Sequence, residues 1–274
     1  MPWKTATLAG VLVVVLGVSM YMLGQSPTGS EEATGSESVM LYCGAGIRPA
    51  VKPAIDAFEK KTGIRVETNY GGSGQLFGQL SSRRKGDLYM PGAEHYVDRG
   101  VKKGLADGDT KRRVAFFIPV ILVQKNNPKD IKTLKDFTRD GLKLGLGQPK
   151  ACAIGKRTVK IFKKNSIPYP RVKENVVYHS TTVNELGVAV EMKQVDATIM
   201  WDANARNFRK VGEIIRIPPE KNIPSIIPIV RLSFSEKPEK ARRFIEFITS
   251  SRAQEIFKEH GYTTSRPGKG KKDS

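Results

Sequence analysis

From Ser38 onward, short apolar runs alternate with stretches in which apolar residues recur at helical spacing. Three short segments that end in turns containing glycine or proline have the pattern of strands. They are the apolar run Val39–Cys43, the alternating segment Ile64–Tyr70 and the short segment Asp87–Pro91. Helical spacing is found between them, at 51–61 and 76–80. The order strand, helix, strand, helix, strand predicts a parallel sheet covered by helices.

The same alternation restarts in the middle of the chain. The strands expected there are 143–147, 176–178 and 197–201, and the helices are 154–164 and 183–193. Two longer apolar runs, Val114–Val123 and Ile226–Leu232, separate these regions and contain Pro119 and Pro228. A central strand disfavours proline because proline has no N–H to donate. We therefore interpret both runs as extended crossings between two lobes.

This organisation predicts an α/β fold of two lobes, a clamshell with two hinge crossings. Each lobe is expected to be a mostly parallel sheet flanked by helices. The first lobe is expected to comprise residues 38–118 and 229–265, and the second lobe residues 119–228. Residues 266–274 are expected to form a basic, disordered tail.

Residues 1–37 have the pattern of a targeting segment. Lys4 precedes an uncharged apolar stretch, Thr5–Leu23, and a polar spacer follows. This order is typical of an export signal or a signal-anchor, and the stretch is close to the ~20 residues that span a bilayer. We predict export to the periplasm or cell surface, with Thr5–Leu23 either cleaved or kept as a membrane anchor.

The chain holds 46 Lys and Arg against 27 Asp and Glu, a formal net charge of +19. Such a field attracts anions, so nucleic acid is the first partner to consider. Export argues against it, as does the lack of aromatic residues interleaved with basic clusters, and no nucleic-acid partner is expected. The charge is ascribed to a solvated surface or to contact with anionic lipid. With only two cysteines, Cys43 and Cys152, a disulfide-stapled scaffold and a four-cysteine zinc site are excluded; the two either bridge or remain small thiols.

Ligands of open parallel sheets bind beyond the carboxyl ends of the strands, where helices begin. The turns at such places are Cys43–Ile47, Tyr70–Gln75, Gln148–Gly155, Ser180–Asn184 and Trp201–Asn204. A helix N-terminus offers unpaired N–H groups and about half a positive charge, which suits an oxyanion. Ser73, among three glycines, can add a hydroxyl donor. The alternative is that Ser73 only caps its helix.

Enzymatic patterns are poor. The Gly-x-Ser-x-Gly elbow of hydrolases begins at Gly71 but meets Gln75 where its last glycine belongs. Asp202 and Glu185 are better explained as helix caps than as an acid/base pair. No enzyme is expected; a secreted serine hydrolase using Ser73, with His179 as its only candidate histidine, is the alternative from a different class.

The turns and strands together resemble the periplasmic molybdate-binding proteins of ABC importers. The resemblance rests on Leu41-Tyr-Cys-Gly-Ala-Gly, Tyr70-Gly-Gly-Ser-Gly-Gln-Leu, Gly86-Asp-Leu-Tyr-Met-Pro-Gly, Gln148-Pro-Lys-Ala-Cys-Ala-Ile-Gly, Thr182-Val-Asn and Ala197-Thr-Ile-Met-Trp-Asp-Ala, in that order. It covers Val39 to Tyr262 and implies the type II periplasmic-binding-protein fold, whose lobes close on one tetrahedral dianion.

Carried over position by position, the resemblance implies that hydroxyl and backbone N–H groups hold the anion. The implied ligand-binding residues are Gly44, Ala45, Gly72, Ser73, Cys152, Ala153, Val183, Trp201 and Asp202. The main donors would stand at Ala45, Ser73, Ala153 and Val183. Two positions depart from the family: Ala45 replaces a frequent serine, and Trp201 a frequent tyrosine. Asp202 is expected either to point away and cap a helix or to coordinate the metal of the oxyanion.

The resemblance thus implies a monomeric receptor that uses no cofactor. It would capture molybdate or tungstate and deliver it to the membrane permease of an ABC importer. Within the binding class, sulfate and phosphate are the alternative ligands.

Overall fold

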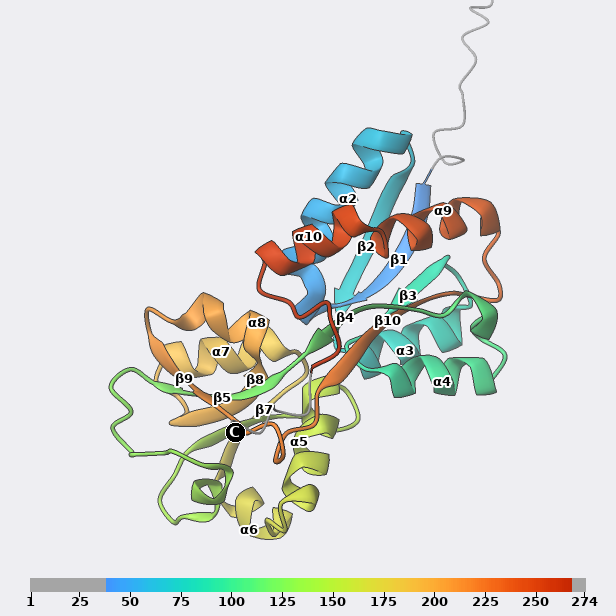
Figure 1. Ribbon diagram of the computed structural model, residues 1–274. Coiled ribbons are helices and arrows are strands. Elements are labelled where there is room, and N and C mark those ends of the chain that lie inside the picture. Colours follow the sequence, from blue (N-terminus) through green and yellow to red (C-terminus); the bar gives the residue numbers. More distant parts are fainter. Residues whose placement is uncertain (1–37, 268–274) are drawn as a thin grey trace, which may run out of the picture. The chain divides into compact units, whose positions relative to one another are not determined.

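The computed structural model describes residues 38–267, and these fold around two five-stranded sheets (Figure 1). The first sheet has the order β2 (Arg65–Gly71), β1 (Ser38–Gly44), β3 (Leu88–Met90), β10 (Ser225–Arg231) and β4 (Arg112–Phe117). The second has the order β7 (Val176–Ser180), β6 (Leu144–Gly147), β8 (Ala197–Trp201), β5 (Pro119–Gln124) and β9 (Gly212–Arg216). In each sheet only the fourth strand, β10 in the first and β5 in the second, is antiparallel to the others. The predicted architecture of two mostly parallel α/β lobes is confirmed.

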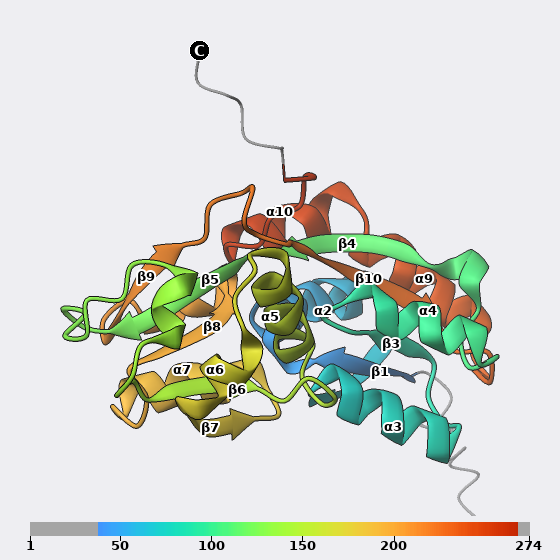
Figure 2. The same cartoon turned by 90° about the horizontal axis from the view of Figure 1, so that it is seen from below.

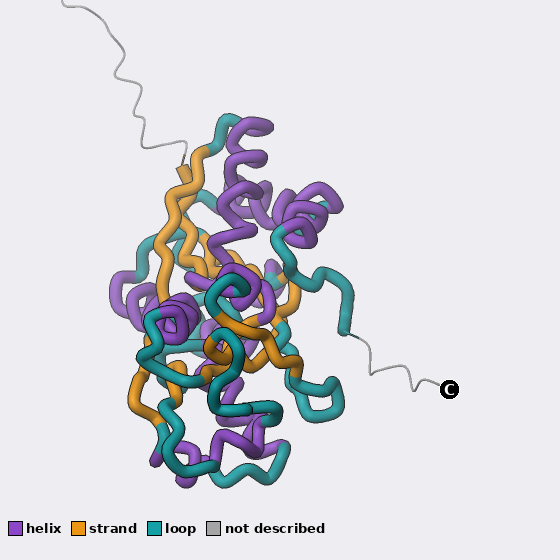
Figure 3. Tube along the Cα trace, turned by 90° about the vertical axis from the view of Figure 1, so that its left-hand side faces the viewer, coloured by secondary structure: helices purple, strands orange, loops and turns teal. Residues whose placement is uncertain are grey.

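Helices cover both faces of each sheet (Figures 1 and 3). In the first lobe, one face carries α2 (Arg48–Thr62), α9 (Pro238–Ile248) and α10 (Ser251–Glu259), and the other α3 (Ser73–Arg83) and α4 (Glu94–Lys102). In the second lobe, α7 (Val183–Glu191) and α8 (Asp202–Ala205) lie opposite α5 (Ala153–Lys164) and α6 (Tyr169–Glu174). Short 3-10 turns are η1 (Ala45–Ile47), η2 (Gly108–Thr110), η3 (Leu134–Thr138) and η4 (Arg206–Phe208).

Local sequence explains where these elements start and stop. Proline near the start of α2 suits the first helical turn, where no N–H partner is needed, and Gly63 ends the helix in the left-handed conformation with φ +72°. Apolar residues on one side of α2 then face the C-terminal helices: the Phe58 ring meets those of Phe244 and Phe247 at 5.1 and 5.5 Å. The end of the chain is thereby packed onto its beginning.

The two long apolar runs prove to be strands as well as crossings. β4 ends at Phe117 and β5 begins at Pro119, so the chain passes from the first sheet to the second at Ile118 (Figure 2). Pro119 fits because it is the first residue of its strand. The return lies between β9 and β10, at 217–224, and the Asn222 side chain ties the crossings by donating to the Pro119 carbonyl at 2.8 Å.

The expected position of the return crossing needs correction. Pro228, taken as the end of the second lobe, lies inside β10 and pairs with Arg113 of the first sheet. The strand tolerates this proline because its register with β4 shifts between Ile227 and Pro228. β10 begins three residues before Pro228, at Ser225, and belongs wholly to the first sheet.

No helix within residues 38–267 is long and apolar enough to cross a membrane. The predicted signal or anchor segment, Thr5–Leu23, and most of the predicted basic tail lie outside the described residues.

The packing of α2 against α9 predicts a large cost for Phe244→Ala. The ring is fully buried, so truncation should lower the free energy of unfolding by about 3–5 kcal/mol. The matched control is Met192→Ala, because that side chain is 63% exposed and its loss should cost about 0.5 kcal/mol or less. Urea denaturation measures both; equal costs for the two variants would show that the C-terminal helices do not pack as described.

Candidate functional site

Four helix starts converge on one place between the lobes. Ala45 opens η1, Ser73 opens α3, Ala153 opens α5 and Val183 opens α7, so each lobe supplies two. Each of these residues lies at or just beyond the carboxyl end of a parallel strand, as sequence analysis predicted. At none of the four starts does the side chain at the cap position accept a hydrogen bond, whereas α10 is capped by the Ser250 hydroxyl. The Gln75 and Glu185 side chains reach back instead to the Gly72 N–H at 3.1 Å and the Thr181 N–H at 3.0 Å. The N–H groups of the first turns, apart from that of Gly74, are therefore available to a ligand.

These helix starts enclose a cavity of about 20 Å³. It is lined by Gly44, Ala45, Gly46, Ile47, Gly71, Gly72, Ser73, Gly92, Phe117, Cys152, Ala153, Thr182, Val183 and Trp201. A single water needs ~10–15 Å³ by this kind of measure, so the space suits one small ion. No lining side chain is charged: burial raises the pKa of the Cys152 thiol to about 11, which keeps it neutral. The cavity thus offers neutral donors and helix dipoles.

Eight of the nine predicted binding residues line this cavity, and Asp202 does not. The Asp202 carboxylate instead accepts a hydrogen bond from the Ile118 N–H at 3.2 Å, at the first crossing. Burial raises the pKa of this carboxyl, and backbone N–H donors act in the opposite direction. Asp202 therefore holds the crossing to the start of α8 and is not among the residues that line the cavity. Coordination of the ligand by Asp202 stays an untested alternative.

The Ser73 hydroxyl is placed to donate into the cavity. Its side chain is 3% exposed, and its Oγ accepts the Gly92 N–H at 3.0 Å. The Tyr89 hydroxyl donates a hydrogen bond to the Ser73 carbonyl at 2.7 Å. Ser73 is the first helical residue and Gly72 takes the cap position, so Ser73 does not cap α3. Because its oxygen already accepts a bond, the hydroxyl proton remains to be donated to a ligand.

The geometry gives no support to the hydrolase alternative. His179 is exposed on β7, and no histidine or carboxylate is among the residues that line the cavity. Ser73 therefore has no general base beside it. Cys43 and Cys152 are both buried free thiols rather than a disulfide.

The lobes touch directly around the cavity, and glycines permit this. The Gly74 N–H donates to the Ala151 carbonyl of the second lobe at 2.8 Å. A Cβ on Gly74 would lie 2.0 Å from the Lys150 carbonyl oxygen, and one on Gly72 would lie 2.3 Å from that of Thr181. The glycines before and after Ser73 thus serve the contact between lobes.

Side-chain contacts that sequence analysis missed join the two lobes around the cavity. Phe117 of the first lobe stacks on Trp201 of the second, with ring centroids 4.6 Å apart. The Gly46 carbonyl accepts both the Asn204 side-chain amide at 2.9 Å and the Tyr262 hydroxyl at 2.6 Å. Gly92 was within a recognised motif but was not assigned a role. Asn204 and Tyr262 carry no local signal, because their partner is more than 150 residues away along the chain.

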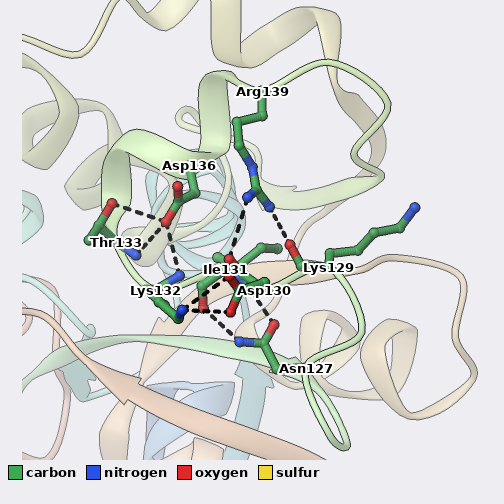
Figure 4. Close-up of polar contacts among 8 residues, drawn as sticks. All are labelled: Asn127, Lys129, Asp130, Ile131, Lys132, Thr133, Asp136 and Arg139. Carbon is green, nitrogen blue, oxygen red and sulfur yellow. Dashed lines mark hydrogen bonds and ion pairs between the residues drawn. The ribbon is translucent and has the colours of Figure 1, made fainter.

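Two larger hollows, of about 760 and 720 Å³, lie on the second lobe near the crossings. Basic residues line them, including Arg206 and Arg209 in the first and Lys135 in the second. The loop that walls the second is held by its own polar contacts (Figure 4): the Asp136 carboxylate accepts the N–H groups of Lys132 and Thr133 at 2.9 and 2.7 Å. Neither hollow is lined by any of the four converging helix starts.

Comparison with known proteins defines the class. The profile of the bacterial extracellular solute-binding proteins matches residues 39–263, and the chain belongs to this family. A binding protein of Haemophilus influenzae is 29% identical over 82% of this chain and 91% of its own length. The molybdate-binding protein ModA of Mycobacterium tuberculosis is 24% identical over 86% of this chain and 88% of its own length. The extracellular family agrees with the predicted export.

Solved structures share the fold at low sequence identity. The periplasmic molybdate-binding protein of Azotobacter vinelandii superposes with a TM-score of 0.70 at 16% identity, covering 83% of this chain and 100% of the other. The sulfate-binding protein SubI of M. tuberculosis has a TM-score of 0.71 at 20% identity, covering 82% of this chain and 86% of the other. AfuA of Actinobacillus pleuropneumoniae, solved with fructose-6-phosphate, has a TM-score of 0.75 at 15% identity, covering 84% of this chain and 85% of the other. These neighbours confirm the type II periplasmic-binding-protein fold.

The close approach at Gly74 predicts that Gly74→Ala prevents full closure. In small-angle X-ray scattering, the variant should have a larger radius of gyration than the wild type, because the added methyl meets the Lys150 carbonyl. The control is Gly78→Ala on the same helix, where a Cβ meets nothing within 4 Å. That control should close normally and gain about 0.5–1 kcal/mol of stability. Normal closure of Gly74→Ala would contradict the described contact.

Proposed function

We propose that this protein captures molybdate or tungstate between its lobes and delivers it to the permease of an ABC importer. The observation that supports this most is the convergence of four uncapped helix starts on a cavity without charged side chains. A doubly negative guest satisfies N–H groups from all four helices at once. Each charge-assisted hydrogen bond of this kind contributes about 1.5–3 kcal/mol, so several suffice for tight binding after the cost of closure.

The size of the cavity favours a simple ion over an organic phosphate. A volume of about 20 Å³ leaves no room for a sugar phosphate of the kind bound in the AfuA structure. A metal cation is disfavoured too, since no group of three or more His, Cys, Asp or Glu side chains within residues 38–267 could hold one. The remaining class is the small tetrahedral oxyanions.

Protonation and size select among these oxyanions. Phosphate near neutral pH keeps a proton that requires a buried acceptor. The Asp202 carboxylate is directed to the Ile118 N–H and the Glu185 carboxylate to the Thr181 N–H, and neither lines the cavity. Sulfate, molybdate and tungstate are full dianions and need only donors. Ala45 lacks the hydroxyl of the serine common in relatives and leaves more space, which favours the larger molybdate and tungstate over sulfate.

The charge of the protein and its N-terminal segment would help to bring the anion to the permease. The net charge of +19 raises the local concentration of anions and speeds their capture. Export would place the receptor at the outer face of the membrane, beside its permease, and the N-terminal apolar segment would retain it there if it is not cleaved. The receptor acts as a monomer, since two lobes of one chain complete the site.

Isothermal titration calorimetry with molybdate, tungstate, sulfate and phosphate tests the proposal. Molybdate and tungstate should bind with sub-micromolar dissociation constants, a free energy beyond about −8 kcal/mol. Sulfate should bind at least tenfold more weakly, about 1.4 kcal/mol, and phosphate should give no heat. Tighter binding of sulfate than of molybdate would reassign the ligand, and the absence of heat with all four anions would end the proposal.

A further inference from the structure

A chain of three hydrogen bonds leads from an arginine of the second lobe to the Ser73 hydroxyl. The Arg157 guanidinium on α5 donates to the Ser225 Oγ at 2.8 Å. The Ser225 hydroxyl donates to the Gly92 carbonyl at 2.9 Å, and the Gly92 N–H donates to the Ser73 Oγ at 3.0 Å. We propose that Arg157 is a positioning residue: through this chain it fixes the Gly92 backbone, which orients the Ser73 hydroxyl toward the bound oxyanion. The inference rests on the proposed oxyanion function and adds a residue to it.

The chain holds the Gly92 backbone from both sides of its Cα. The Ser225 hydroxyl binds the Gly92 carbonyl, and the Gly92 N–H binds the Ser73 Oγ. The Ser73 oxygen is thereby fixed as an acceptor, and its proton is left for the cavity. Ser225 is fully buried and Ser73 nearly so, so water does not compete for these bonds. Arg157 thus aids an anion that it does not touch.

The surroundings of Arg157 contain no other strong counter-charge. Within residues 38–267, Arg157 forms no ion pair. Its nearest acidic influence, Glu94, is already paired with Lys111 at 2.6 Å. Burial lowers the pKa of the guanidinium without neutralising it. Partly buried charges are costly unless balanced, and a dianion in the cavity supplies that balance when it binds.

The chain also spans the two lobes. Arg157 belongs to α5 of the second lobe, whereas Ser225, Gly92 and Ser73 belong to β10, to the segment after β3 and to α3 of the first. Contact between Arg157 and Ser225 therefore requires α5 to lie against the first lobe, between the two sheets as Figure 2 shows. One bond therefore couples closure of the lobes to the orientation of the Ser73 hydroxyl.

A double-mutant cycle separates this role from a general field effect and from a simple tie between the lobes. The dissociation constant for molybdate is measured by calorimetry for Arg157→Gln, Ser225→Ala, Ser73→Ala and the double variant of Arg157→Gln with Ser73→Ala. The control is Lys160→Gln, which removes one positive charge from the exposed face of the same helix.

The chain predicts about tenfold weaker binding for Arg157→Gln and for Ser225→Ala, and a change below about twofold for Lys160→Gln. In the Ser73→Ala background, Arg157→Gln should weaken binding by less than about twofold, because its effect passes through the missing hydroxyl. Thermal melting of the ligand-free variants shows that each is folded, and Ser225→Ala tests the chain independently if Arg157→Gln does not fold.

Two outcomes overturn the inference while leaving the proposed function intact. One is wild-type affinity in both Arg157→Gln and Ser225→Ala. The other is a full tenfold loss from Arg157→Gln in the Ser73→Ala background, which would show that Arg157 acts only as a tie between lobes. Failure of the wild-type protein to bind any oxyanion would instead remove the proposed function itself.

Discussion

The structure depends on a single electrostatic constraint: four helix starts meet at one point, and at none of them does the side chain at the cap position satisfy the first N–H groups. Their exposed N–H groups create a positive potential in a space too small for much water. Closing two such surfaces on each other is unfavourable unless something negative lies between them. The absence of lysine or arginine from the cavity follows naturally, because helix dipoles and N–H groups already supply the attraction and can share the charge of a symmetrical ion.

Close contact between the lobes makes this arrangement effective. Gly72 and Gly74 let the backbone of α3 meet the second lobe, and the Phe117–Trp201 stack excludes water from one side. A low-dielectric cavity strengthens each hydrogen bond to an anion and equally penalises one that is missing. The same contact brings Arg157 to Ser225, so the positive charge proposed to support the site acts through other groups rather than by direct contact. A direct lysine or arginine contact would bind many anions; a cage of neutral donors selects by shape.

Most of the strands and helices, and the position of the cavity, were predictable from local sequence. Strand ends and helix starts follow from short-range pattern, and β1, β6, β8 and α5 agree with expectation within a residue or two. Pro119 and Pro228 led us to expect crossings rather than strands. A strand accepts proline at its first residue, as at Pro119, or at a shift in register, as at Pro228, and neither feature is visible without the partner strand. The direction of Asp202 depends on an N–H 84 residues away, and the links from Asn204 and Tyr262 to Gly46 depend on closure. Motifs located the cavity, but tertiary contacts decided which side chains face it.

Crystals grown with tungstate test the central claim most directly, because the anomalous scattering of tungsten locates the ion without ambiguity. The account predicts one strong peak between the lobes, with oxygen atoms within hydrogen-bond distance of the Ser73 hydroxyl and the Val183 N–H. A tungsten peak found only in the basic hollow beside Arg206, or no peak between the lobes, would contradict it.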